Sequence, residues 1–391
     1  MNEQKFLQYR QALSHVTSPV LAVDLEYFEE NLKWAPEVLK HTKNKTIRIA
    51  TKSIRSVSLL KKILSSNSIY QGLMTYSLQE ALWLQELGFK DILMGYPTVD
   101  RAALEKLAKE PSQIILMVDL IEHLDLLESI ASQNKTQFEI CVDIDLSFDL
   151  PGLRFGVYRS ELHDLKSLEA FLKHLKTCSH LKLVGLMGYE AQIAGVGDKT
   201  DKKIQILKRF SLIDLKKRRK HMVDLVRSNG FDLKIINGGG TGSLFSTKEE
   251  TVVTEVTLGS AFYGPVLFDY YQDFSLRPSM FFGLPITRHP KENIFTCFSG
   301  GYIASGALDK KKLPLPYLPS GMELLPYEGA GEVQTPVRYD GVEKLKVGDL
   351  IFFRHAKAAE ICERFLEIQL IKGHRSEDKI LTYRGEGKSF G

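Results

Sequence analysis

The sequence predicts an α/β fold in which a TIM-type (β/α)8 barrel is followed by a C-terminal, mostly β domain. Apolar runs alternate with helical patterns over most of the first 265 residues. The runs are nearly continuous rather than alternating, which is typical of strands buried on both faces of a parallel sheet. Beyond residue 266, Pro and Gly become denser and short apolar runs replace this rhythm. That change favours a second domain rich in β-structure.

The predicted strands follow one another with helical patterns between most of them. They cover residues 20–25, 47–52, 72–77, 91–97, 114–120, 138–146, 181–189, 233–240 and 253–262. When the first is set aside, eight strands remain, which is the number in a TIM-type barrel. A doubly wound open sheet is the alternative, but no G-x-G-x-x-G motif follows an early strand.

Two of the helical patterns carry specific predictions. In the stretch 76–88, Ser77 is a candidate N-cap, Glu80 completes a capping box and Gly88 can occupy the C′ position. A longer pattern covers 201–228 and contains five consecutive basic residues at 216–220. A solvated helix face is the favoured interpretation of this run, ahead of nucleic-acid binding.

Composition and cysteine spacing limit the class of protein. The 391 residues are 43% hydrophobic and 26% charged, with a net charge of +4, as in an ordinary globular protein with a sizeable core. Cys141, Cys178, Cys297 and Cys362 are scattered and form no C-x-x-C motif, so a disulfide framework and a metal knuckle are both disfavoured. The N-terminus has no apolar signal core, and no segment approaches a membrane-spanning run. We expect a cytoplasmic protein with neither nucleic acid nor membrane as its partner.

Unusual residues stand at the ends of several predicted barrel strands, where barrels gather their function, and Asp119, Asp143 and Asp145 are among them. Lys52 ends the first barrel strand, and a lysine partly desolvated there could act as a nucleophile and form a Schiff base. The glycine-rich turn 237–243 follows another strand and could cradle an anion with its backbone N–H groups. A lone strand-end lysine is more often a surface residue, and a lone GGGTG is more often a loop. Together, however, they suggest pyridoxal 5′-phosphate (PLP).

These residues resemble those of the PLP-dependent enzymes with the alanine-racemase type of fold, called fold type III. The chain is most similar to the D-threonine aldolase and D-serine dehydratase branch and to "amino acid deaminase/aldolase" sequences, from SPVLAVDL to FFRHAKAAEICERF. The resemblance implies that Lys52 holds the cofactor and that a short N-terminal strand joins the C-terminal β domain. The predicted domains are therefore an N-terminal strand segment (1–30), a PLP-binding barrel (31–266) and a C-terminal β domain (267–391).

The resemblance also implies further cofactor contacts. In DLPGLRFGV, Arg154 would bond the phenolate oxygen of the cofactor or order its neighbourhood, with a surface ion pair as the alternative. Both Tyr189 and Glu190 in MGYEAQ could line the pocket, and Tyr263 is a ligand or a core residue. The phosphate contacts that NGGGTGS and VTLGSAFYGP imply are Gly239, Gly240, Thr241, Gly242, Gly259 and Ser260.

Two positions depart from the family pattern. Racemases place an Arg against the pyridine nitrogen where this chain has Thr257. Strand alternation puts Glu255 on the same face, where it could reach the ring, although an inter-strand polar contact is favoured. Aldolases and dehydratases bind a divalent metal through His-x-Asp or His-x-Cys, whereas here His355 is followed by Lys357 at the second position. Because an ammonium has no free lone pair, we expect a weakened or absent metal site, with His355 as its candidate ligand.

Catalytic candidates come from the C-terminal domain. His355 could be a general base or a buried structural histidine, and Lys357 could supply a fixed charge or an acid–base group. In the family, the second domain approaches the cofactor opposite the lysine, often from the partner subunit, which makes Tyr302 a candidate and predicts a homodimer. The implied function is a lyase acting on small D-amino acids, by aldol cleavage or by dehydration and deamination of a β-hydroxy substrate. An amino-acid racemase is the runner-up; a PLP-binding homeostasis protein and a PLP-free barrel aldolase using Lys52 remain open.

Overall fold

The computed structural model of the chain describes residues 2–42, 44–110 and 112–391. They divide into two units, which are considered one at a time. The barrel unit consists of Pro36–Thr51, Ile63–Gly259 and Phe390–Gly391. The β unit consists of Met1–Ala35, Lys52–Lys62 and Ser260–Ser389.

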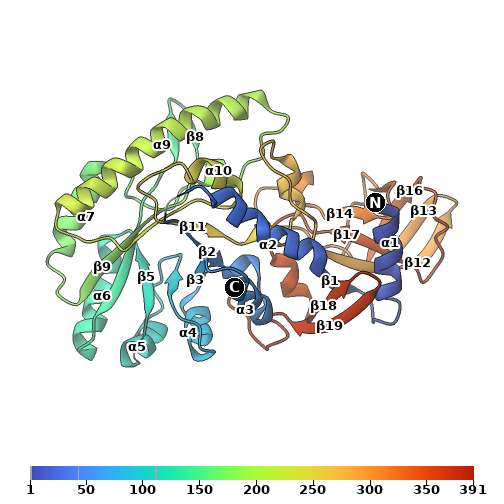
Figure 1. The fold of residues 1–391 in the computed structure, drawn as a ribbon, viewed down its shortest axis with the longest axis horizontal. Coiled ribbons are helices and arrows are strands. Elements are labelled where there is room, and N and C mark those ends of the chain that lie inside the picture. The colour runs from blue at the N-terminus through green and yellow to red at the C-terminus, as the bar shows by residue number, and fades with distance from the viewer. Residues whose placement is uncertain (1, 43, 111) are drawn as a thin grey trace. The chain divides into compact units, whose positions relative to one another are not determined.

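A closed barrel of parallel strands forms the centre of the barrel unit (Figure 1), and its neighbours run in the order β10-β11-β2-β3-β4-β5-β6-β9. The strands are β2 (Thr46–Ala50), β3 (Tyr70–Thr75), β4 (Ile92–Met94), β5 (Ile114–Val118), β6 (Phe138–Asp143), β9 (Leu181–Gly188), β10 (Ile235–Gly238) and β11 (Glu255–Leu258). Each predicted barrel strand has its counterpart, so the predicted barrel is confirmed. Every residue of β5 is buried, as a strand covered on both faces requires.

Several strands end earlier than the sequence predicts. β2 stops at Ala50, and Lys52 lies in a 3₁₀ turn, η1 (Thr51–Ser53). β11 is likewise shorter than the run 253–262, which continues into another 3₁₀ turn, η3 (Ser260–Phe262). The apolar run marks which residues are buried, whereas the strand ends where ladder hydrogen bonds stop, and the two limits differ at a barrel rim.

Helices connect the barrel strands along the chain. Their bounds are α2 (Leu25–Leu39), α3 (Val57–Ser66), α4 (Leu78–Glu86), α5 (Arg101–Lys109), α6 (Ile121–Asn134), α7 (Leu165–Leu175), α8 (Ala191–Ala194), α9 (Lys202–Ser228) and α10 (Leu244–Thr247). Of those in the barrel unit, α4 to α7 and α9 lie on the outside of its strands (Figure 1). α9 begins after Asp201, whose carboxylate accepts hydrogen bonds from two backbone N–H groups, and this confirms the predicted long helix. A short 3₁₀ turn, η2 (Thr241–Ser243), precedes α10.

The predicted capping of α4 is confirmed in part. The Ser77 side chain accepts from the N–H of Glu80, and Gly88 adopts a left-handed conformation with φ of 87°. The Glu80 carboxylate, however, accepts from the N–H of Tyr76 at 2.9 Å. The capping box is therefore not closed, because its second bond goes one residue too far towards the N-terminus.

One large sheet forms the β unit. It runs in the order β15-β16-β13-β12-β1-β18-β19, with β17 on β12 and β14 on β17. Its strands are β1 (Val20–Asp24), β12 (Met280–Lys291), β13 (Ile294–Phe298), β14 (Leu315–Leu318), β15 (Met322–Leu324), β16 (Gln334–Tyr339), β17 (Leu350–Arg354), β18 (Glu367–Lys372) and β19 (Arg375–Leu381). β1 pairs antiparallel with β12 and parallel with β18, so the N-terminal strand does join the C-terminal β structure.

The helix α1 (Asn2–Ala12) in the β unit was not predicted from the sequence. It buries Phe6 and Tyr9, and the Tyr9 ring stacks on Phe281 with centroids 4.2 Å apart. The Tyr9 hydroxyl donates to the Asp24 carboxylate at 2.6 Å, and Lys5 binds the same carboxylate at 2.7 Å. The segment is mostly polar, so its tertiary contacts rather than an apolar stripe mark it as a buried helix.

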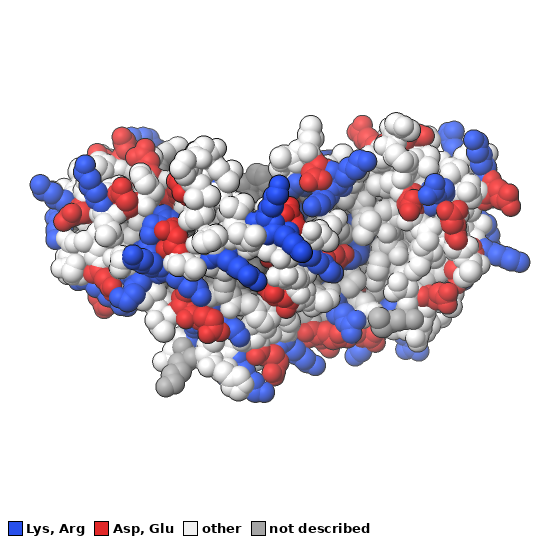
Figure 2. All heavy atoms as spheres, turned by 90° about the horizontal axis from the view of Figure 1, so that it is seen from above, with Lys and Arg blue, Asp and Glu red and all other residues white. Residues whose placement is uncertain are grey.

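The remaining sequence predictions can be read from burial and surface charge. All four cysteines are free and buried, so none of them pairs in a disulfide. In the described ranges, none of the helices combines the length and apolar character that a membrane crossing requires. Figure 2 shows Lys and Arg interspersed with Asp and Glu over the face that it draws.

Candidate functional site

Lys52 lies in a short turn whose neighbours are firmly anchored. Thr51 and Ser53 are buried, while the Lys52 side chain is exposed, which corrects the partial burial expected from the sequence. The Thr51 hydroxyl donates to the Met74 carbonyl at 3.0 Å, and Arg55 Nε donates to the Lys52 carbonyl at 3.1 Å. The backbone on both sides is thus fixed, and the amine extends outward from a defined position just after β2.

The turn after β11 is joined to this lysine turn. The Ser260 hydroxyl lies 3.4 Å from the Ser53 hydroxyl, and the Tyr263 hydroxyl donates to the Ile54 carbonyl at 2.8 Å. The strands β2 and β11 are neighbours in the barrel, so their carboxyl ends bring these turns together. Tyr263 is fully buried, and burial raises the pKa of its hydroxyl well above the usual range. Tyr263 therefore belongs to the core beneath the lysine turn.

His355 follows β17 and is buried. In the described part of the chain neither ring nitrogen makes a hydrogen bond, and the Tyr263 ring packs edge-on at 6.4 Å. Burial lowers the pKa of His355 to about 3, and the charge of neighbouring Arg354 adds to this effect, against a smaller opposing effect of the Met280 backbone. A base with such a pKa is weak at neutral pH, so this environment corresponds to the structural alternative. Lys357, two residues on, is half-buried.

No metal cluster accompanies His355. Over residues 2–42, 44–110 and 112–391, no group of three or more His, Cys, Asp or Glu side chains is arranged to hold a metal ion. The donor set that follows β17 is one buried imidazole and the ammonium-bearing Lys357, which does not fit a divalent cation.

Tyr302 follows a turn of unusual backbone conformation, in which Ser299 has φ of 69° and Gly300 has φ of 124°. Its hydroxyl shares a 2.8 Å hydrogen bond with the Ser299 hydroxyl. Its ring packs edge-on against Phe282 and Phe365. Burial raises the pKa of Tyr302, so its hydroxyl is held as a neutral donor at physiological pH.

In the barrel unit, the glycine-rich turn follows β10. Gly239 has φ of 80°, and a Cβ on it would lie 2.6 Å from the Val256 side chain, so only glycine fits. The N–H of Gly239 donates to Glu190 and that of Gly240 to the Ser243 hydroxyl, and the first backbone–backbone hydrogen bond of the turn runs from Ser243 N to the Gly240 carbonyl. The N–H groups of Thr241 and Gly242 precede that bond, and among the described residues neither donates a hydrogen bond. They can serve an anion.

Tyr189 and Glu190 diverge after β9. A Cβ on Gly240 would lie 3.2 Å from the Tyr189 ring, so Tyr189 packs on the glycine-rich turn. The Arg159 guanidinium lies 5.5 Å from the centre of the same ring, and burial raises the pKa of Tyr189 to about 12. Glu190 instead points inward, fully buried, to an ion pair with Arg219. The expectation that Glu190 could line the pocket is therefore wrong, because a guanidinium binds it inside the protein.

Thr257 and Glu255 share a buried polar network. The Asn237 amide donates to Thr257 Oγ1 at 2.8 Å and to Glu255 Oε1 at 2.7 Å. Arg48 holds both oxygens of Glu255, at 2.7 and 2.9 Å. Glu255 thus makes the inter-strand polar contact that the sequence favoured. Because Arg48 binds both of its carboxylate oxygens, Glu255 is not available for another charged contact.

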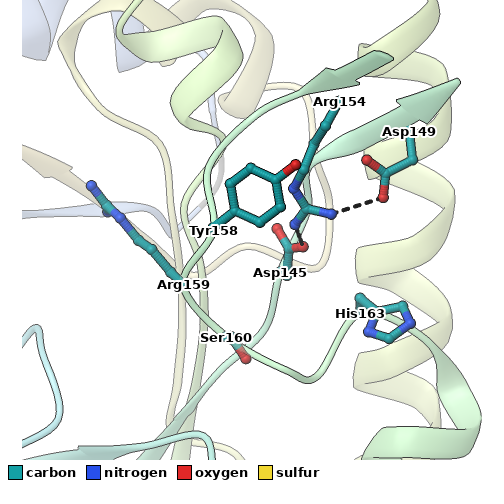
Figure 3. Close-up of a pocket in the computed structure, with 7 residues that line it drawn as sticks. All are labelled: Asp145, Asp149, Arg154, Tyr158, Arg159, Ser160 and His163. Carbon is teal, nitrogen blue, oxygen red and sulfur yellow. Dashed lines mark hydrogen bonds and ion pairs between the residues drawn. The ribbon is translucent and has the colours of Figure 1, made fainter. Parts of the chain in front are cut away.

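Arg154 lies in a hairpin, β7 (Phe148–Leu150) and β8 (Leu153–Phe155), that the strand predictions did not include. Its guanidinium binds Asp145 and Asp149, the latter at 2.9 Å, and donates to the Val157 carbonyl at 3.0 Å. These contacts correspond to the ion-pair alternative. Figure 3 shows Arg154 turned towards the two carboxylates, whereas Arg159 points away from them. The pocket has a volume of about 380 Å³ and is lined by Asp145, Asp149, Arg154, Tyr158, Arg159, Ser160 and His163.

Asp143 is a candidate that the sequence placed at a strand end without a role. It ends β6, and the pKa of its carboxyl is raised to about 8 by burial and by Asp119, with Asp145 adding to this effect and Arg159 opposing it. The two carboxyls at 143 and 145 follow one strand, and this spacing was the available signal. Groups whose pKa is shifted towards neutrality are often functional.

Arg219 was missed because it belongs to the basic run 216–220. A usable signal was present, since Leu215, Met222 and Val226 stand four before, three after and seven after it and share one helix face. The run is therefore only partly solvated. Arg218 also turns inward, donating to the carbonyls of Asp145, Ser147 and His163.

Comparison with known proteins places these features in context. Residues 23–266 match the family model described as "Alanine racemase, N-terminal domain". A curated 3-hydroxy-D-aspartate aldolase of Paracoccus denitrificans (strain Pd 1222) is 22% identical over 250 residues, 63% of this chain and 60% of that protein. The chain thus matches about three fifths of the length of the curated relatives.

Solved structures are similar over nearly the whole chain. D-threonine aldolase from Filomicrobium marinum has a TM-score of 0.81 at 17% identity, covering 95% of this chain and 97% of that one. D-threo-3-hydroxyaspartate dehydratase from Delftia sp. HT23 has a TM-score of 0.79 at 15% identity, covering 95% and 98%. Alanine racemase of Clostridium difficile 630 in complex with cycloserine has a TM-score of 0.67 at 16% identity, covering 93% and 98%. At such identities these similarities establish the fold alone.

Proposed function

Because the chain belongs to the alanine racemase N-terminal domain family, we propose that it is a PLP-dependent lyase acting on small D-amino acids. The substrate would carry a β-hydroxyl group. Aldol cleavage would give glycine and an aldehyde, or loss of water would lead to a keto acid and ammonia. The observation that carries the proposal is Lys52, an exposed amine on an anchored turn directly after the barrel strand β2.

The residues present fit the cofactor. The Lys52 amine can hold its aldehyde carbon, and the N–H groups of Thr241 and Gly242 can donate hydrogen bonds to its phosphate oxygens. Ser260, joined to the lysine turn through Ser53, supplies a further hydroxyl. When bound, the cofactor supplies an electron sink for the substrate carbanion.

Side chains of both units are candidates for proton transfer and for binding the substrate charge. The Asp143 carboxyl can hold or release a proton near neutral pH, since its pKa of about 8 is close to that value. Arg159, with no ion pair among the described residues, can bind a substrate carboxylate. His355 is not assigned as the base, because its pKa of about 3 leaves it without affinity for a proton at neutral pH. Lys357 and Tyr302 keep their predicted acid–base roles as part of the proposal.

A racemase is the second candidate. The family takes its description from alanine racemase, and an alanine racemase is among the similar structures. Racemisation needs a proton-handling group on each face of the substrate, with Lys52 on one face and Tyr302 or Lys357 opposite. The two candidates differ in their products, which makes them separable by one experiment.

The proposal is tested by proton NMR of the PLP-loaded protein in deuterium oxide. D-threonine, D-serine and 3-hydroxy-D-aspartate would be compared with their L-forms. We expect an aldehyde with glycine, or a keto acid, from a D-substrate only. Deuterium at the α-carbon with inversion and no cleavage would establish the racemase instead.

A matched pair of lysine variants checks the central assignment. Lys52→Ala should abolish turnover and the visible absorbance that PLP gains on the protein, whereas Lys344→Ala, at an exposed position, should change neither. If Lys52→Ala keeps both, the proposal is wrong. Absorbance without any substrate change would favour a PLP-binding homeostasis protein, and turnover without PLP a cofactor-free barrel aldolase.

A further inference from the structure

Arg219 occupies the buried face of α9. Its side chain is only 1% exposed, inside a run of basic residues that otherwise favours solvent. A buried guanidinium is tolerated only where its charge and its donors are matched. Its partners therefore indicate what this arginine supports.

The partners of Arg219 lie at the end of β9 and after α10. Nη2 donates to the Gly188 carbonyl at 2.9 Å and to Glu190 Oε2 at 2.8 Å. Nη1 donates to Glu250 Oε1. The guanidinium also packs against Gly238, the last residue of β10, where a Cβ would lie 3.1 Å from Nη2. Arg219 thus fixes the carboxylate of Glu190 beside the start of the glycine-rich turn.

Glu190 binds both ends of the segment 239–247, which contains the glycine-rich turn from Gly239 onward and α10. Oε2 accepts from the N–H of Gly239 at 3.1 Å, at the entry to the turn. Oε1 accepts from the hydroxyl of Thr247, the last residue of α10, at the end of the segment. Both bonds are buried, so they are shielded from competition by water. One carboxylate therefore sets the conformation of the segment 239–247.

We infer that Glu190 and Arg219 are positioning residues that set the affinity of the glycine-rich turn for the phosphate group of the cofactor. This inference rests on the proposed function, in which the turn binds that phosphate. Glu190 takes up the Gly239 N–H and leaves those of Thr241 and Gly242 for the anion. Arg219 is shared by Glu190 and Glu250, and its positive charge reduces the repulsion that these carboxylates would exert on a phosphate.

The test compares PLP with pyridoxal, which has the same aldehyde and ring but no phosphate. Dissociation constants would be measured by absorbance titration of the cofactor-free wild type, Glu190→Gln, Thr247→Val and Thr247→Ser. We expect Glu190→Gln and Thr247→Val to weaken PLP binding about tenfold, as the loss of a charge-assisted hydrogen bond would. Pyridoxal binding should change by less than about twofold, and Thr247→Ser should retain wild-type affinity because it keeps the hydroxyl.

Two further measurements separate positioning from general stability. Asp198→Asn removes the carboxylate from another buried pair of α9, whose Asp198–Lys208 distance is 2.9 Å, and should leave PLP affinity unchanged. Hydrogen exchange of the cofactor-free protein should be faster at the amides of 239–242 in Thr247→Val than in wild type or Asp198→Asn. This second readout needs neither cofactor nor turnover.

The outcomes distinguish this inference from the proposed function. If the variants weaken PLP and pyridoxal equally, or if Asp198→Asn reproduces the loss, the network is merely structural and the inference is wrong. If the wild type binds PLP no better than pyridoxal, the turn is not the phosphate site, although the cofactor assignment survives. If the wild type binds neither, the proposed function fails, and the inference with it.

Discussion

The glycine-rich turn 237–243 and Arg154, which lies in the hairpin 148–155, were both predicted to serve the cofactor, yet the structure supports them in different ways. Behind the turn stand Glu190 and Arg219, which are 0% and 1% exposed. In the hairpin, Arg154 is 21% exposed and its partner Asp149 is 57% exposed. The first pair is sealed from water, whereas the Arg154–Asp149 pair is partly solvated, chiefly at Asp149.

This difference in solvation separates two kinds of ion pair. Removing one member of a buried pair leaves an uncompensated charge inside the protein, which costs several kcal/mol. Removing one member of a solvated pair lets water replace it and costs little. The turn is therefore held from behind by a sealed pair, whereas in the hairpin water can replace the outer contact of Arg154 with Asp149 but not the inner one with Asp145, which is 4% exposed.

The largest expected effect is that of Arg219→Met. It strands Glu190 and Glu250 without their shared cation, so the free energy of unfolding should fall by about 3–5 kcal/mol. Urea unfolding followed by circular dichroism measures the loss. Lys217→Met, exposed on the same helix, should change it by less than about 0.5 kcal/mol. Similar losses in the two variants would remove the distinction between the buried and solvated faces of α9.

His355 extends the comparison to the β unit with a pH dependence. Its folded-state pKa of about 3 lies below the usual value of 6.5, so the unfolded chain binds the proton first as pH falls. The stability that His355 contributes is thus complete above pH 6.5 and is lost as pH falls towards 3, by about 1 kcal/mol between pH 6.5 and 5.5. Urea midpoints of wild type and His355→Gln at the two pH values measure it. An equal pH dependence in the variant would contradict the assignment.

The smallest expected effect is that of Asp149→Asn. Arg154 keeps Asp145 and the Val157 carbonyl, so stability should change by less than about 0.5 kcal/mol and PLP affinity by less than about twofold. Thermal unfolding and absorbance titration check both values. A tenfold loss of PLP affinity would show that the hairpin serves the cofactor, as the resemblance implied, and that its solvated pairs matter more than their exposure indicates.

Buried apolar runs were sufficient to predict the barrel, because strands covered on both faces must be apolar throughout. They did not locate the strand ends, since pairing stops at Ala50 although the sequence pattern continues to Lys52. The helix α1 escaped prediction for the opposite reason. Its buried residues include Lys5, whose charge is satisfied by Asp24 in a strand that only the fold brings near.

The candidate site was predicted to the extent that single residues carry a chemistry of their own. Lys52 and the glycines at 239 and 240 are recognisable because an amine and a Cβ-free backbone are rare at strand ends. Arg219 was hidden among like charges, and the environment of His355 depends on residues far away in the chain. No local sequence pattern indicates that Arg219 is buried or that His355 is shielded from water.

By itself, the sequence determined the order of buried strands, the cysteine chemistry and the lysine after β2, because each follows from residue type and local spacing. Only the tertiary structure decided which charges are buried and with whom they pair. Glu190 follows β9, Arg219 lies in α9 and the glycine-rich turn follows β10, and only the fold brings these three segments together. Burial is a property of the packed chain, and the strength of an ion pair depends on it.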